Sequence, residues 1–186
     1  PTTARADGSS PRIQRLPNNS PMPALGFQFQ YKPKDGWILN YSNFIGNAQP
    51  DSLKALRHFH NLYLQYESQK NWGFIFGLDL GMDKYNRNDY AIWYSPVFIL
   101  RYRWTRNWTS AARVEYYADK QGIIFPTGTQ NGFQTFGVSF NQDLQLNSNI
   151  KLRLEYRYLQ SKDAIFNNQN EGNHSINSAC IFSFQK

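Results

Sequence analysis

The chain has 186 residues, of which 17% are aromatic and only 18% are charged, with a formal net charge of +7 at pH 7. This abundance of aromatic residues excludes an intrinsically disordered chain, which is typically poor in them. The mean hydropathy is low and the sequence has no run of ~18 apolar residues, so a membrane-spanning helix is excluded as well.

Apolar and polar residues alternate with a period of two, which predicts β-strands along most of the chain. In 152–158, for example, even-numbered positions carry Leu or Tyr and odd-numbered positions carry Arg or Glu. The predicted strands are 23–32, 36–45, 55–67, 71–82, 90–105, 107–118, 131–145, 149–160 and 174–185. Several reach the ~9–11 residues with which a tilted strand crosses a bilayer. Pro96 falls inside one of them and predicts a bulge or a locally unpaired group there.

The connections alternate between tight polar turns and longer polar loops. The turns are at 33–35, 68–70, 106 and 146–148, and the loops are at 46–54, 83–89, 119–130 and 161–173. In outer-membrane barrels the short turns are periplasmic and the longer loops are extracellular. The pattern therefore predicts an outer-membrane barrel whose last strand descends to the periplasm.

Aromatic residues flank three of the four short turns. Amphipathic rings at this height would lie where hydrocarbon meets the lipid head groups. The predicted aromatic girdle consists of Tyr31, Trp37, Tyr66, Trp72, Trp104 and Trp108.

The predicted fold is all-β, an antiparallel transmembrane β-barrel formed by residues 21–186, after a polar, proline-containing extracellular loop or linker at 1–20. Nine visible strands is an odd number, whereas bacterial single-chain barrels close with an even one. We therefore expect a larger, even-stranded barrel, completed by upstream strands of the same protein or by another chain; one misassigned strand would leave eight instead. The soluble alternative, a lipocalin-like carrier, would place Phe27 and Phe76 inside the barrel.

Charged residues concentrate on the predicted lumen side of the strands. The predicted pore-lining residues are Arg101, Arg103, Arg113, Glu115, Lys151, Arg153, Glu155 and Arg157. With Lys32, Arg57, Asp79 and Asp143 added, the assignment holds eight basic residues against four acidic ones. Cross-strand pairs, such as those between 113–115 and 153–155, would brace the wall, and the basic surplus would favour anions. Because the basic residues are spread along whole strands and form no single patch, we expect no nucleic-acid binding.

Few patterns indicate catalysis or metal binding. His58 and His60 share one face of a strand, but no third ligand lies near them on that face, so we interpret them as structural. His174 precedes Ser175, but a nucleophile–base pair would require spatial evidence. The lone Cys180 excludes an internal disulfide. The sequence thus predicts no enzyme, no cofactor and no metal site.

Several segments resemble a known family. They are Gly36–Gly46 (Gly-Trp-Ile-Leu-Asn-Tyr-Ser-Asn-Phe-Ile-Gly), Gln49–Ser52, Trp93–Pro96, Arg113–Asp119 and Thr127–Thr135. They are similar to the C-terminal half of the OmpL-like β-barrel porin-2 family of Bacteroidetes, over about residues 22–186. The resemblance implies an outer-membrane location and a pore, and it supplies no catalytic residues.

The expected function is passive diffusion of small hydrophilic solutes, with a mild preference for anions. The expected partners are outer-membrane lipid and these solutes. A closed barrel with a structural or surface-interaction role is the alternative, followed by an outer-membrane hydrolase.

Overall fold

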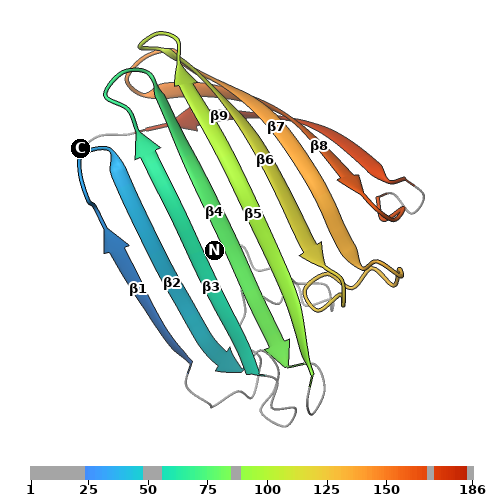
Figure 1. The fold of residues 1–186 in the computed structure, drawn as a ribbon. Helices are drawn as coiled ribbons and strands as arrows, with labels where there is room; N and C mark the ends of the chain where they lie inside the picture. Colours follow the sequence, from blue (N-terminus) through green and yellow to red (C-terminus); the bar gives the residue numbers. More distant parts are fainter. Residues whose placement is uncertain (1–23, 48–55, 85–88, 167–169, 184–186) are drawn as a thin grey trace.

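A computed structural model describes residues 24–47, 56–84, 89–166 and 170–183; the predicted linker at 1–20 lies outside these ranges. Nine antiparallel strands form one sheet in which they follow their order in the chain (Figure 1). They are β1 (Leu25–Tyr31), β2 (Trp37–Asn47), β3 (Leu56–Glu67), β4 (Trp72–Lys84), β5 (Tyr90–Arg103), β6 (Trp108–Asp119), β7 (Phe133–Gln145), β8 (Ile150–Ser161) and β9 (Gly172–Phe182). Each predicted strand overlaps one of them, so the all-β prediction is confirmed. No helix in the described ranges is long and apolar enough to cross a membrane.

Polar side chains close the tight turns by accepting backbone hydrogen bonds. Ser68 Oγ accepts from the N–H of Lys70 at 3.1 Å. Thr105 Oγ1 accepts from the N–H of Trp108 at 3.1 Å, and Asn147 Oδ1 accepts from the N–H of Ile150 at 3.0 Å. These residue types favour turns because their short side chains reach the neighbouring backbone.

The strand register sorts residues onto two faces, because directly opposed residues on neighbouring strands point to the same side. One apolar row comprises Leu39, Leu64, Phe76, Phe98, Val114 and Val138. A polar row of the opposite face comprises Gln28, Ser42, Asn61, Asp79 and Ser95.

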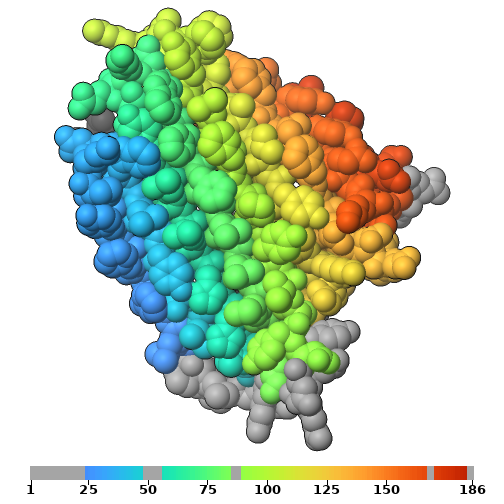
Figure 2. Space-filling view, in the orientation of Figure 1, coloured from blue at the N-terminus to red at the C-terminus, as the bar shows by residue number. Residues whose placement is uncertain are grey.

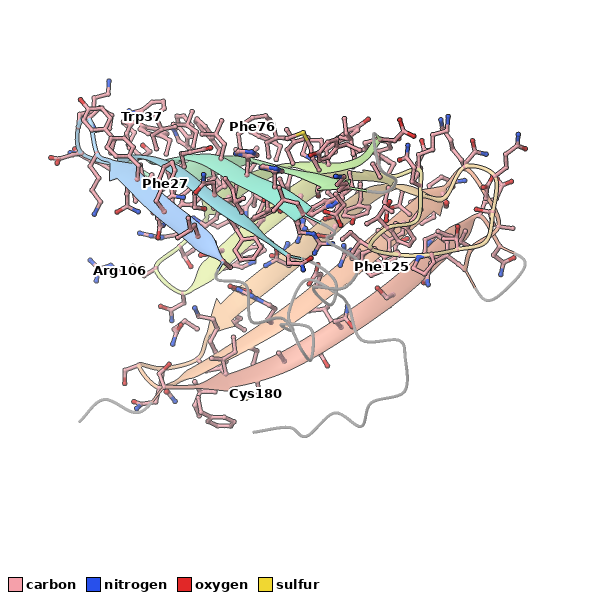
Figure 3. All side chains as sticks on the ribbon, turned by 90° about the horizontal axis from the view of Figure 1, so that it is seen from below. Phe27, Trp37, Phe76, Arg106, Phe125 and Cys180 are labelled. Atoms are coloured by element: carbon pink, nitrogen blue, oxygen red, sulfur yellow. The ribbon has the colours of Figure 1, made fainter. Side chains whose placement is uncertain are left out.

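The sheet curls so that its apolar face is convex. Trp37 and Phe76 project from the convex side of one half of the sheet, and Cys180 projects from the convex side of the other (Figure 3). Figure 2 looks onto this face, where ring-bearing side chains gather over β2 to β6. Its exposed apolar residues include Phe27, Phe29, Phe98, Leu100, Phe136, Phe140, Leu152 and Leu154. Since Phe27 and Phe76 both lie on this face, the lipocalin-like alternative is wrong.

Glycines leave three positions on the concave face of β4 without a side chain. Gly73, Gly77 and Gly81 recur at every fourth residue and point to the same side. A Cβ at Gly77 would approach Val97 Cγ1 to 2.9 Å, and one at Gly81 would overlap the indole of Trp93. Side chains of neighbouring strands therefore lie flat across β4.

Pro96 interrupts the ladder between β5 and β6 without changing its register. Tyr94 pairs with Ala118 and Val97 pairs with Glu115, and the two pairs between them are missing from the ladder. Proline has no N–H to donate, so the predicted unpaired group is present and the alternative of a bulge is wrong.

The sheet is open in the described part of the chain. β1 pairs with β2 alone and β9 with β8 alone, which leaves each with one free edge. The described strands therefore do not close into a barrel by themselves, as the sequence predicted.

Candidate functional site

Ion pairs line the concave face. Six arginines pair there with four acidic residues: Arg57 with Asp83, Arg101 and Arg103 with Glu67, Arg113 and Arg157 with Glu115, and Arg153 with Asp143. All of these residues come from β3 to β8, whose alternation places one residue in two on this side. The predicted pore-lining arginines are thus brought together on one surface.

Glu115 of β6 is shared by two arginines. Its Oε2 accepts from Nη2 of Arg113 on the same strand, and its Oε1 accepts from Nη2 of Arg157 on β8. Gly137 of β7 lies between them, and a Cβ there would stand 2.9 Å from Glu115 Cγ. The sequence predicted that residues 113–115 pair with residues 153–155. This prediction is wrong, because Glu115 pairs with Arg157 instead.

Glu67 of β3 repeats this arrangement nearer the short turns. It pairs with Arg101 of β5 across Gly73 of β4, and Arg103 Nη2 lies 3.8 Å from its Oε1. A small cavity of about 150 Å³ adjoins the pair and is lined in part by Gly73, Ile75 and Ala111. Here too one carboxylate faces two guanidinium groups.

Two other arginines have an acidic partner of their own. Arg153 donates from Nε and Nη2 to the two carboxylate oxygens of Asp143, both at 2.6 Å. Arg57 donates in the same way to Asp83 at 2.7 and 2.5 Å, and the two side chains are only 7% and 6% exposed. Bidentate pairing of this kind satisfies both charges.

An aromatic cluster lies beside Arg57 and Asp83, toward the long-loop end of the concave face. Trp93 lies flat over Gly81 and stacks on Phe59, with ring centroids 5.6 Å apart, and on Tyr117 at 6.3 Å. Phe125, from the β6–β7 connection, contacts Tyr117 edge-on at 5.7 Å. Figure 3 shows Phe125 on the inner side of the curled sheet.

Asp119 anchors that connection to the sheet. It is fully buried, and its carboxylate accepts the backbone N–H groups of Ile123, Ile124 and Phe125 at 2.9, 2.7 and 3.0 Å. Ile124 is also buried. The sequence predicted a solvated loop at 119–130; the structure instead folds its first half against the concave face.

The predicted excess of eight basic residues over four acidic ones is wrong for the described strands. Glu67, Asp83 and Asp119 also lie on the concave face, opposite Gly73, Arg57 and Phe133 respectively. The concave strand residues are then seven basic (Arg57, Arg101, Arg103, Arg113, Lys151, Arg153, Arg157) and seven acidic (Glu67, Asp79, Asp83, Glu115, Asp119, Asp143, Glu155). Lys32 follows the end of β1 and belongs to no strand.

The charges are unevenly distributed along the strands. Asp83 and Asp119 lie at the long-loop end with Arg57, and Asp79 lies near the middle of β4. The remaining charged residues form what we call the basic band, in which Arg101, Arg103, Arg113, Lys151, Arg153 and Arg157 face Glu67, Glu115, Asp143 and Glu155. The surplus of positive charge on the described strands therefore lies outside the long-loop end of the wall.

Five of the six predicted girdle residues make ring contacts on the convex face, as a group of three and a pair. Tyr66 lies 4.6 Å from Trp37 and 5.0 Å from Trp72, and Trp104 lies 5.8 Å from Trp108 (ring centroids). Tyr31 is exposed on the same face. All six flank the short turns, and their contact with the lipid interface stays a prediction.

His60 and His174 form hydrogen bonds with tyrosines on the convex face. Nδ1 of His60 and the hydroxyl of Tyr41 are hydrogen-bonded at 2.7 Å, as are Nδ1 of His174 and the hydroxyl of Tyr156. Ser175 points to the opposite face from His174, so the two cannot act as a nucleophile and its base. No cluster of three or more metal-ligating side chains occurs within the described residues.

Comparison with known proteins gives a matching family and a similar solved structure. Residues 7–185 match the model of the family described as "Putative beta-barrel porin-2, OmpL-like". Among solved structures, that of the NanC porin in a rhombohedral crystal form is similar, with 13% identity, a TM-score of 0.61, and coverage of 87% of this chain and 78% of the other. This likeness shows the fold. No curated protein sequence matches the chain significantly.

Proposed function

Because the chain belongs to the putative beta-barrel porin-2, OmpL-like family, we propose that it forms an outer-membrane channel for passive diffusion of small hydrophilic solutes, with a mild preference for anions. The protein is an outer-membrane β-barrel protein of porin type. The Bacteroidetes source, the assignment to the C-terminal half and the solute are parts of the proposal. Porins are typically channels without enzymatic activity, in agreement with the separation of His174 from Ser175.

The basic band is the observation that carries the anion preference. At Glu115 and at Glu67 one carboxylate faces two guanidinium groups, so each cluster keeps an uncompensated positive charge. Charged walls concentrate counter-ions in a channel. The preference is mild because Asp79 and Glu155 are also on this face.

Asp119 and Asp83 would weaken the preference little. The Asp119 carboxylate is buried and bound by three backbone N–H groups, and Asp83 is neutralised by Arg57. A permeating ion in the lumen therefore meets mainly the surplus of the basic band.

We further propose that additional strands complete the barrel. A strand edge in hydrocarbon leaves backbone N–H and C=O groups unsatisfied, at several kcal/mol each, so transmembrane sheets close. β1 and β9 each carry such an edge. The completing strands would come from upstream in the same protein or from another chain.

The anchored part of the β6–β7 connection would narrow the channel at its extracellular end. Ile124 is buried, and Phe125, which is 38% exposed, contacts Tyr117 on the concave face, where the two residues would occupy lumen cross-section. The same packing favours the second candidate, a closed barrel with a structural or surface-interaction role.

Osmotic swelling of proteoliposomes separates these functions. With the intact protein in the vesicles, uncharged sugars of increasing size should enter at rates that fall with size. Vesicles that hold the heat-unfolded protein are the control. Swelling no faster than in the control would refute the channel and support the closed barrel.

A further inference from the structure

Arg113, Ser139 and Arg157 stand side by side on the concave face, and we propose that they form a discrete binding site for an oxyanion, a carboxylate or phosphate group. The site deepens the proposed function and rests on it in one respect, since the ligand would reach it through the lumen. Binding itself can be measured without transport.

The three residues occupy one row across three neighbouring strands. Arg113 of β6 is opposed by Ser139 of β7, which is opposed by Arg157 of β8. Adjacent strands lie ~4.8 Å apart, so the two arginines flank the serine at distances that long, flexible side chains can bridge. Glu115 lies to one side of this row and draws both guanidinium groups together.

Most of the hydrogen-bond donors in this row remain unused. A guanidinium group carries five N–H donors, and the bonds to Glu115 use Nη2 of each arginine. Within the described residues, Nε of Arg113 and Nε of Arg157 are buried and have no hydrogen-bond partner, so they lie in the wall and do not face the lumen. The two side chains are still 40% and 36% exposed, so other donors face the lumen.

An oxyanion fits this set of groups. Its oxygens accept hydrogen bonds from two guanidinium groups at once, the geometry in which arginine recognises carboxylates and phosphates. Ser139 is only 9% exposed and lies between them, so its hydroxyl would be a third donor at the base of the site. Two positive charges against one negative charge leave the site with the charge that such a ligand would neutralise.

Arg153 provides the contrast within the same band. Both oxygens of Asp143 engage its Nε and Nη2, so its charge and its best-placed donors are already satisfied. Arg153 is 44% exposed, comparable to Arg157. Arg153→Gln is therefore a matched control, because it removes one positive charge from the same strand without removing the proposed donors.

The test is a titration of the intact protein in detergent micelles, followed by NMR line broadening of the ligand. Inorganic phosphate is read by its ³¹P signal and ¹³C-labelled acetate by its carboxyl signal, so the two arms distinguish the sources of the oxyanion. The wild type should broaden at least one signal saturably. Arg157→Gln and Arg113→Gln should each weaken binding about tenfold, as expected for a charged hydrogen bond, and Arg153→Gln by less than about threefold.

Equal weakening in all three variants would overturn the site and leave only diffuse positive charge. The absence of saturable broadening in the wild type would overturn it as well. Failure of the proposed function would give a different result. If the wild type binds phosphate or acetate but gives no swelling of vesicles, the binding site stands and the proposed channel is refuted.

Discussion

Glu115 on β6 and Arg157 on β8 form an ion pair across an intervening strand, in the space left by Gly137 of β7. The same device joins Glu67 to Arg101 across Gly73. Glycine on the concave face thus allows charges two strands apart to meet. The wall stays thin where side chains lie flat along it, which leaves more free space on the concave side.

The pair across Gly137 should depend on that glycine. A Cβ there would stand 2.8 Å from Leu159 Cδ2 and 2.9 Å from Glu115 Oε1, and valine would fill the space that the carboxylate occupies. A double-mutant cycle of Glu115→Gln and Arg157→Gln, measured by urea unfolding in micelles, should give a coupling of about 0.5–1 kcal/mol for this partly buried pair. In the Gly137→Val background the coupling should fall to near zero. A coupling unchanged by valine would show that the pair forms by another path.

Asp119 should hold the β6–β7 connection in place. In Asp119→Ala, the N–H groups of Ile123, Ile124 and Phe125 lose their acceptor, which should lower the free energy of unfolding by about 2–3 kcal/mol. Trypsin should then cleave after Lys120, which adjoins the anchor, at least about tenfold faster, because the segment opens locally. Asp35→Ala, in the exposed turn between β1 and β2, is the control. Equal cleavage rates in the two variants would contradict the anchor.

Asp163 links the β6–β7 and β8–β9 connections, and the link should fail only in acid. Its carboxylate accepts from Asn131 Nδ2 at 2.8 Å and from the Asn131 N–H at 2.9 Å. Hydrogen bonds from the Asn131 side chain, from Thr129 and from the Asn131 backbone lower the pKa of Asp163. A lowered folded-state pKa contributes stability above the unfolded pKa of ~3.9, and that stability is lost as the pH falls through the folded value. Carboxyl NMR of ¹³C-Asp protein should therefore show Asp163 ionised at pH 4. A midpoint above ~3.9 would contradict this assignment.

The two faces of β4 should respond oppositely to charge. Phe76 lies on the convex face and is exposed there, so Phe76→Arg should impair membrane insertion by roughly 2–4 kcal/mol. Ile75→Arg, on the adjacent residue, points to the concave face and should insert almost normally. The fraction folded into lipid vesicles measures both. Equal impairment would contradict the assignment of faces.

Much of this fold is readable from the sequence, because alternation over long strands specifies both the strands and their faces. The positions of Trp37, Phe76 and Arg157 all follow from it. Alternation is less informative near strand ends, where Asp83 and Asp119 were assigned to loops although each continues the parity of its strand, from Asp79 and Glu115 respectively. Continuing that parity would have placed both on the concave face.

Contacts between non-neighbouring strands could not be predicted in the same way. The meeting of Glu115 with Arg157 depends on the register of two ladders and on the missing side chain at Gly137. The packing of Phe125 on Tyr117 depends on how the β6–β7 connection folds, and its polar composition indicated a solvated loop. Tertiary context decides both.

The reversal potential across a planar bilayer with a KCl gradient tests the central claim most directly. The intact protein should conduct with a modest preference for chloride, which weakens as added salt shortens the Debye length from about 10 Å at 0.1 M. Combined replacement of Arg101, Arg103 and Arg113 by alanine should move the reversal potential toward zero. The same replacement of Lys34, Lys70 and Arg106, which are exposed in the short turns, should move it much less. A cation-selective current, or no conductance at all, would contradict an anion-preferring channel.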